Sequence, residues 1–308
     1  AAVISWLGNG VADGSQGPDI SQIPAIALKQ VAVLRDGAAA QYGSDAIAGV
    51  MNFVLKDANE GATFEARYGE FFEGDGATYS VAGNAGFAFT DDGFFNVSFE
   101  YGETDETSRS VQRNDAQALI DAGNTAVAVP AQVWGQPIIN NDLKLVYNMA
   151  VSLDEDREVY AFGNYGNKSV DGGFFFRNPN TRGGVFAGPG VTDVDPVTGE
   201  ETFYPTILTA DLTPGATDNS ACPIVRIIDN APDQDALGDL AAANCFAFNL
   251  LFPGGFTPRF GGDVNDFATT AGLRGVRDDG LNYDFSFSYG RSHVDFNIRN
   301  TINASLGP

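Results

Sequence analysis

Apolar and polar residues alternate along several stretches of this 308-residue chain. The clearest runs, with apolar side chains at every second position, cover residues 62–68, 79–87, 95–101, 143–151 and 281–289. A period of two is the pattern of a β-strand that has one apolar face. Residues 159–167 and 267–276 repeat it less regularly. The pattern therefore predicts about seven strands.

Apart from the first connection, which is short and contains residues 73–76, the connections between these strands alternate in length. Tight acidic turns are expected at residues 90–93, 154–157 and 278–280, and long loops at about 104–142 and 169–263. Short turns at one end of the strands and long loops at the other are typical of outer-membrane β-barrels. We therefore predict an all-β fold, a partial antiparallel transmembrane β-barrel that is not closed. A soluble or surface β-sheet domain is the alternative.

A different pattern covers the residues before the first of these strands. Residues 31–34 and 50–55 are short apolar runs of β type, and residues 38–41 form one helical turn between them. Gly37, Gly43 and Gly49 divide this connection at equal steps. Glycines in such places allow the backbone to bend or to approach another surface closely. A glycine-rich strand connection in any α/β domain would share these features.

The sequence of residues 19–56 resembles the end of the plug domain of TonB-dependent outer-membrane receptors. The resemblance is carried by Ile23-Pro24, VLRDG at 33–37, YGS at 42–44, AIAGV at 46–50, and Asn52 with Lys56. The chain departs from the family at Ala32, where an acidic residue is usual, and at Gln30, where Arg is usual. What the resemblance implies is a receptor that binds a scarce extracellular substrate and imports it with energy delivered by TonB.

The resemblance also implies roles for particular residues. Gln41 and Tyr42 would face the bound substrate from the tip of the plug, and Arg35 would brace the plug inside the polar lumen of the barrel. The glycines that would shape the tip are Gly37, Gly43 and Gly49. The substrate class stays open between a ferric siderophore, a cobalamin, a glycan and a peptide.

By the same resemblance, residues 1–58 are the C-terminal part of an α+β plug domain, and residues 59–308 are the N-terminal portion of the barrel. We expect the chain to be a fragment, whose TonB box, N-terminal plug and remaining barrel strands lie outside it. Residues 31–56 should then lie against the concave side of the sheet. The aromatic residues expected on the convex, lipid-facing side are Phe64, Tyr79, Phe99 and Phe285.

Composition and charge restrict the classes of function that this chain can have. A formal net charge of −23 argues against nucleic-acid binding, because phosphate neutralisation needs Lys and Arg, and it fits solvated acidic loops. The resemblance implies a location in the outer membrane of a Gram-negative bacterium. No GxSxG elbow or P-loop is present, so we expect no enzyme and no cofactor. A passive outer-membrane porin would share the strands and loops but would need no plug.

The long loops contain the remaining candidates for chemistry. Cys222 and Cys245 are the only cysteines, and an exported loop would be oxidised, so we expect a disulfide; two free thiols are the alternative. Residues 193–201 are acidic, but they lack the ligand pattern of an EF-hand and indicate an exposed hairpin. His293 has no second histidine with which to form a zinc site, so we expect no metal. Short helices are expected at 114–123 and 232–243.

Overall fold

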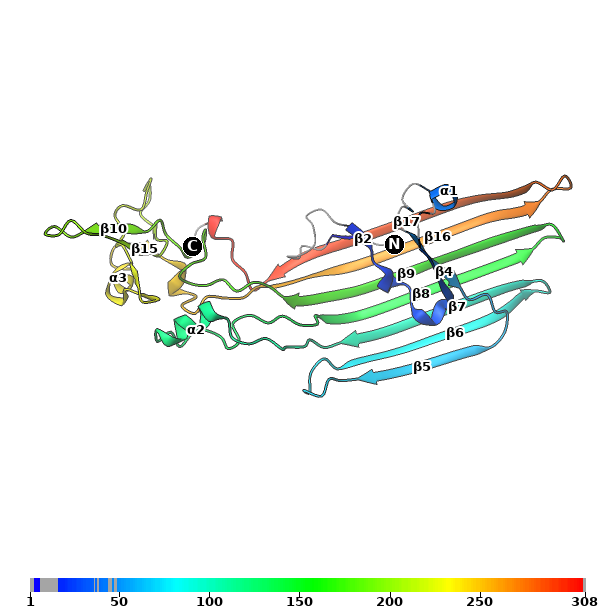
Figure 1. The fold of residues 1–308 in the computed structure, drawn as a ribbon, viewed down its shortest axis with the longest axis horizontal. Coiled ribbons are helices and arrows are strands. Elements are labelled where there is room, and N and C mark those ends of the chain that lie inside the picture. Colours follow the sequence, from blue (N-terminus) through cyan, green and yellow to red (C-terminus); the bar gives the residue numbers. More distant parts are fainter. Residues whose placement is uncertain are drawn as a thin grey trace. The chain divides into compact units, whose positions relative to one another are not determined.

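The structure is a computed structural model, and it describes residues 3–5, 16–35, 37, 39–43, 46 and 49–306. The chain divides into two compact units. The first, the sheet unit, comprises residues 1–106, 137–171 and 261–296; the second, the loop unit, comprises residues 107–136, 172–260 and 297–308. Figure 1 shows the elements of both units.

Seven strands form the main sheet of the sheet unit, in the order β17-β16-β9-β8-β7-β6-β5. They are β5 (Ala62–Gly69), β6 (Thr78–Thr90), β7 (Gly93–Thr104), β8 (Ile138–Ser152), β9 (Arg157–Gly173), β16 (Arg259–Val276) and β17 (Asn282–Arg299). Within the described residues β5 and β17 are the two edges, so the sheet is open. The predicted fold class is therefore confirmed, with strands that extend beyond the predicted runs.

The order of the strands places alternate connections at the same end of the sheet. The β6–β7, β8–β9 and β16–β17 connections are the short acidic turns, and the two long loops join β7 to β8 and β9 to β16. Because neighbouring strands run antiparallel, both long loops start from the end opposite to these turns. This one-sided arrangement agrees with the prediction.

One face of the sheet carries exposed apolar side chains. Cross-strand partners in one row across β5 to β9 are Phe64, Gly83, Phe99, Leu145 and Tyr165. Phe64 is 68% exposed and Leu145 41% exposed. The ring of Phe99 covers Gly83, where a Cβ atom would lie 2.4 Å from it. Tyr79 and Phe285, the other aromatic residues expected on this side, are also exposed.

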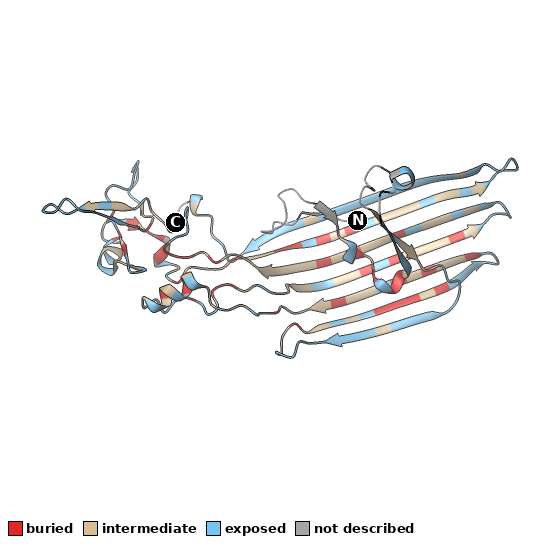
Figure 2. Ribbon diagram, viewed as in Figure 1, coloured by how far each residue is buried: buried red, intermediate tan, exposed pale blue. Residues whose placement is uncertain are grey.

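The opposite face carries polar side chains, and these are buried. They are Asn84, Asn96, Ser98, Lys144 and Lys168, none more than 8% exposed. Figure 2 shows the buried positions on the central strands of the sheet, while β5 and β17 are mainly exposed. We call this side of the sheet the polar face.

The segment before the sheet is described here as the plug-like segment, residues 16–58. Its elements are β2 (Gln16–Pro18), η1 (Ile20–Gln22), η2 (Ala25–Ala27), β3 (Leu28–Arg35), α1 (Ala39–Tyr42) and β4 (Gly49–Leu55). β2 pairs with β1 (Val3–Ser5), and β3 pairs antiparallel with β4. The predicted order of strand, helical turn and strand is thus present.

The loop unit has a hydrophobic core of its own. The cluster of Ile207, Val225, Ile227, Leu240 and Ala247 surrounds Cys222 and Cys245, which are joined by a disulfide. A second cluster contains Ala116, Leu119, Val127, Ala131 and Phe176. The short strands are β10 (Val191–Val194), β11 (Glu201–Tyr204), β12 (Ala210–Asp211), β13 (Ile227–Ile228), β14 (Ala231–Pro232) and β15 (Cys245–Phe246).

Two helices of the loop unit lie near their predicted positions. α2 (Asn114–Asp121) is followed by Gly123 with φ of +91°. α3 (Gln234–Asp239) begins after Asp233, whose side chain accepts hydrogen bonds from two backbone amides of the first turn, the usual N-cap arrangement. The predicted end of this helix at residue 243 is wrong. The carbonyl of Leu240 accepts a hydrogen bond from the amide of Cys245 at 2.8 Å, so the chain turns into β15.

Candidate functional site

The tip of the plug-like segment is the connection between β3 and β4. Tyr42 is the last residue of α1 and is 44% exposed. The backbone of Gln41 belongs to α1, but its side chain lies outside the described part of the chain. A substrate-facing role for both residues stays a prediction.

Two of the three glycines at the tip have backbone conformations that suit glycine. Gly43 has φ of +94° and Gly49 has φ of +147°, in the region that L side chains rarely adopt. A Cβ atom on Gly49 would also lie 2.4 Å from the carbonyl oxygen of Leu34. Gly49 pairs with Arg35 at the end of the hairpin, and the side chain of Arg35 is exposed. The expected bracing role of Arg35 stays a prediction.

The residues after β4 are fixed to the polar face through their backbone. Asn148 donates a hydrogen bond to the carbonyl of Lys56 at 3.0 Å, and Asn96 donates one to the carbonyl of Ala58 at 3.1 Å. Asn84 in turn donates to the side-chain oxygen of Asn96 at 2.6 Å, which orients it. The polar face therefore supplies the donors that the linker carbonyls need when they are removed from water.

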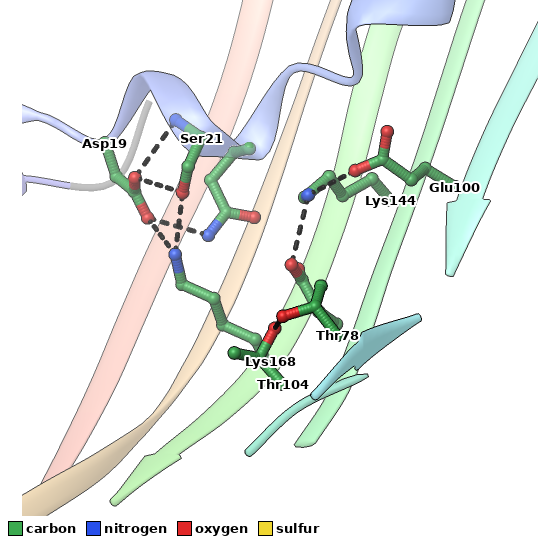
Figure 3. Close-up of polar contacts among 9 residues, drawn as sticks. Asp19, Ser21, Thr78, Glu100, Thr104, Lys144 and Lys168 are labelled. Atoms are coloured by element: carbon green, nitrogen blue, oxygen red, sulfur yellow. Dashed lines mark hydrogen bonds and ion pairs between the residues drawn. The ribbon is translucent and has the colours of Figure 1, made fainter. Parts of the chain in front are cut away.

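The residues before β3 are fixed to the same face by an ion pair. The Nζ atom of Lys168 on β9 lies 2.8 Å from Oδ2 of Asp19 and donates to Oγ of Ser21 at 2.7 Å (Figure 3). The side chains of Lys168 and Asp19 are only 10% and 9% exposed. Burial tends to raise the pKa of Asp19, but hydrogen bonds from Lys168, Ser21 and Gln22 outweigh it and lower the pKa to about 2. Asp19 is therefore a carboxylate at neutral pH.

Gln22 completes this contact. Its side chain is buried, 1% exposed as a residue, and its Nε2 atom donates to Asp19 Oδ2 at 2.9 Å. Directly beneath it lies Gly166 of β9, where a Cβ atom would be 1.9 Å from Gln22 Oε1. A residue with a side chain at 166 would displace Gln22, and with it the hydrogen bond to Asp19.

A second buried charge cluster belongs to the sheet alone. Lys144 of β8 lies 2.6 Å from Glu100 of β7 and 3.1 Å from Asp142. Figure 3 shows this cluster beside the one formed by Asp19 and Lys168. The two lysines thus differ in their partners: Lys144 holds neighbouring strands together, and Lys168 holds the plug-like segment.

The expectation that residues 31–56 as a whole lie against the sheet needs correction. Among the described residues, the ion pair, the hydrogen bonds and the η2 contacts with the sheet come from the residues on either side of the hairpin, namely 19–27 and 56–58. Val31, Val33 and Met51 of the hairpin are 45%, 58% and 56% exposed. The polar face offers hydrogen-bonding groups, and these pair with the carboxylate and the carbonyls that flank the hairpin.

Lys168 and Asp19 were missed by the sequence analysis. They lie 149 positions apart, and Lys168 falls one residue beyond the predicted strand. A signal was nevertheless present, because the chain has only four lysines against 40 acidic residues. A lysine at an inward position of a strand in such an acidic chain requires a partner.

The remaining candidates for chemistry in the loop unit have structural roles. Oδ1 of Asp195 accepts hydrogen bonds from the amides of Val197 and Thr198 at 2.7 and 2.8 Å, which lowers its pKa and closes the turn between β10 and β11. This is the predicted exposed hairpin. Over the described residues, no group of three or more His, Cys, Asp or Glu side chains is placed to hold a metal ion.

The aromatic residues of the loop unit contact one another. Trp134 packs edge-on against Phe175, and Phe252 lies against Phe256. Phe176 is buried in the second core cluster. These contacts agree with a packing role for the loop aromatics.

Among the helices that the structure describes, none has the length and apolar character needed to cross a membrane.

The sheet and the segment on its polar face together define a class of protein. An open antiparallel sheet with an exposed apolar face, and a strand–turn–strand segment held to its polar face, is a partial β-barrel with part of a plug. Residues 4–50 match the family model described as TonB-dependent Receptor Plug Domain, which confirms the resemblance over that segment. No curated protein and no solved structure matched the chain.

Proposed function

We propose that this chain is part of a TonB-dependent receptor that binds a scarce extracellular substrate and imports it into the periplasm with energy delivered by TonB. The match of residues 4–50 to the plug domain supports this proposal most directly, because a plug distinguishes an energised transporter from a passive porin. In this proposal residues 1–58 are the C-terminal part of the plug, and residues 59–308 are the N-terminal portion of the barrel.

The proposed location is the outer membrane of a Gram-negative bacterium, in contact with its lipid. The exposed apolar row that contains Phe64 and Leu145 supports this location, because barrel strands alternate apolar side chains toward lipid and polar side chains toward the lumen. The long loops would then extend to the outside of the cell, and the acidic turns would lie in the periplasm.

The proposed substrate contact is the tip formed by Gln41 and Tyr42. Gly43 and Gly49 both have positive φ angles at this tip, and Tyr42 exposes an aromatic ring with a hydroxyl group. Such a ring can stack on a substrate and donate a hydrogen bond to it. Ferric siderophores, cobalamins, glycans and peptides all offer surfaces of this kind.

The test uses the complete receptor that contains this chain, in cells with and without TonB. Uptake of one member of a panel of the four substrate classes should require TonB. Tyr42→Ala should weaken binding of that substrate about tenfold, equivalent to about 1.4 kcal/mol, and Tyr42→Phe should separate stacking from hydrogen bonding. TonB-independent conductance in liposomes would instead identify a porin. Unchanged affinity in a correctly folded Tyr42→Ala receptor would remove Tyr42 from the site.

A further inference from the structure

We propose that Asp19, Ser21 and Lys168 form a latch, which seats residues 19–27 in one register on the polar face and opens only by separation of the two surfaces into water. The latch does not depend on the transport proposal, since it concerns a contact within the sheet unit. In this proposal Lys168 positions the plug-like segment and does not serve to hold the strands of the sheet together.

Both charges of the latch are buried. The side chains of Asp19 and Lys168 are 9% and 10% exposed, and a buried charge that loses its partner is left without compensation. A small displacement of the segment would therefore separate the two charges from each other while both remain buried in the contact. Complete separation returns both to water, where each is well solvated. The contact consequently favours two states, seated or detached, over intermediate ones.

Gln22 fits closely over Gly166. The Nε2 atom of Gln22 is already bonded to Asp19, and its Oε1 atom occupies the space of the missing side chain at Gly166. Lys168 lies two positions further along the same strand, on the same face. The glycine and the lysine thus recognise adjacent residues of the segment, and a shift along β9 would lose both contacts together.

Separation of the segment from the sheet would expose a surface of hydrogen-bonding side chains. The side chains of the polar face near the segment, Asn84, Asn96, Ser98 and Asn148, all form hydrogen bonds. Water can replace such bonds at low net cost, because the net contribution of a hydrogen bond is small when both partners can be solvated. The latch therefore fixes the register of residues 19–27 on the polar face, and the two surfaces can still separate.

The test measures how often residues 19–27 leave the sheet. Ala27 is 2% exposed and belongs to η2, which contacts β6 and β7, so Ala27→Cys is a reporter for maleimide labelling. Cys222 and Cys245 are joined and do not react. Lys168→Met, which keeps the length of the side chain and removes its charge, should accelerate labelling at least tenfold in the complete receptor that contains this chain, held in lipid. Lys168→Arg should remain protected.

Two matched controls are present in the chain. Lys29 and Asp57 form an ion pair of the same 2.8 Å length, but with side chains 54% and 49% exposed, so Lys29→Met should change labelling less than twofold. Lys144→Met removes a buried lysine whose partners among the described residues, Glu100 and Asp142, belong to the sheet, and it should also leave Ala27→Cys protected. Equal acceleration by Lys144→Met and Lys168→Met would assign the effect to general loosening of the sheet and overturn the latch.

Two further variants keep the proposal testable if Lys168→Met folds poorly. The exchange Asp19→Lys with Lys168→Asp should restore protection to within threefold of the parent chain. Gly166→Ala should accelerate labelling at least fivefold, whereas Gly290→Ala, where a Cβ atom meets only ordinary contacts of 3.7 and 3.9 Å, should not. Unchanged labelling in Lys168→Met or in Gly166→Ala, or an exchange that labels as fast as Lys168→Met, would overturn the proposal.

Discussion

The two units of this protein place apolar and polar side chains in opposite ways. In the loop unit Val225 and Leu240 are fully buried, and acidic turns such as the one at Asp195 face solvent, as in a protein that folds in water. In the main sheet Phe64 and Phe285 are 68% and 70% exposed, and Lys144 and Lys168 are buried. One chain is therefore built for two surroundings.

In the proposed membrane location, the physical reason for this difference is the neighbour of each surface. A row of exposed aromatic and aliphatic side chains is unfavourable in water but is stable against hydrocarbon. Buried amide and ammonium groups such as those of Asn96 and Lys168 are tolerated on the polar face because they have hydrogen-bonding partners. The same rule, that polar groups must be paired or solvated, produces both arrangements.

The largest expected effect comes from a charge on the apolar face. Leu145 lies at the middle of β8 and is 41% exposed. Leu145→Arg should reduce the folding free energy in lipid by about 2 to 4 kcal/mol, the cost of Arg at a bilayer midplane. Denaturant titration of the complete receptor folded into liposomes measures it. Val111→Arg, at an 83% exposed position of the loop unit, should change it by no more than about 0.5 kcal/mol. A neutral Leu145→Arg would show that the sheet faces water.

The disulfide tests whether the loop unit is stabilised independently of the sheet. Replacing Cys222 and Cys245 by Ser opens a connection of 23 residues in sequence separation. In the chain-entropy account this should cost about 3 kcal/mol. Hydrogen exchange should accelerate at the amides of β12 and β15 and stay unchanged in β6 to β8. If β6 to β8 loosen equally, the two units unfold together and the comparison between them fails.

Acid should weaken the contact between the plug-like segment and the polar face. The pKa of Asp19 is lowered from 3.8 to about 2, so its contribution is complete above about pH 4 and is lost as the pH falls through about 2. By linkage this amounts to about 2 kcal/mol. Hydrogen exchange of residues 19–27 from pH 5 to pH 2 should show the loss. Asp19→Asn should abolish this pH dependence, and a persisting dependence would place the titrating group elsewhere.

Local pattern predicted much of the fold. The period of two located every strand of the main sheet, and the alternation of short and long connections gave the end at which the loops start, because both signals depend on neighbouring residues. The end of α3 was predicted too late, since the hydrogen bond from Cys245 to Leu240 belongs to the packed loop unit. The resemblance identified the tip around Tyr42, but it could not say which residues hold the segment.

The sequence alone determined the alternation of apolar and polar residues, the glycine-framed tip and the plug-like character of residues 19–56. Only the tertiary structure decided that Asp19 meets Lys168 and that Gln22 fits over Gly166. The reason is that a strand pattern specifies which face a side chain occupies, while the partner on that face depends on how distant segments pack. Lys168 lies one residue beyond the predicted strand, and its partner carboxylate, that of Asp19, lies 149 positions away and is brought to it by the fold.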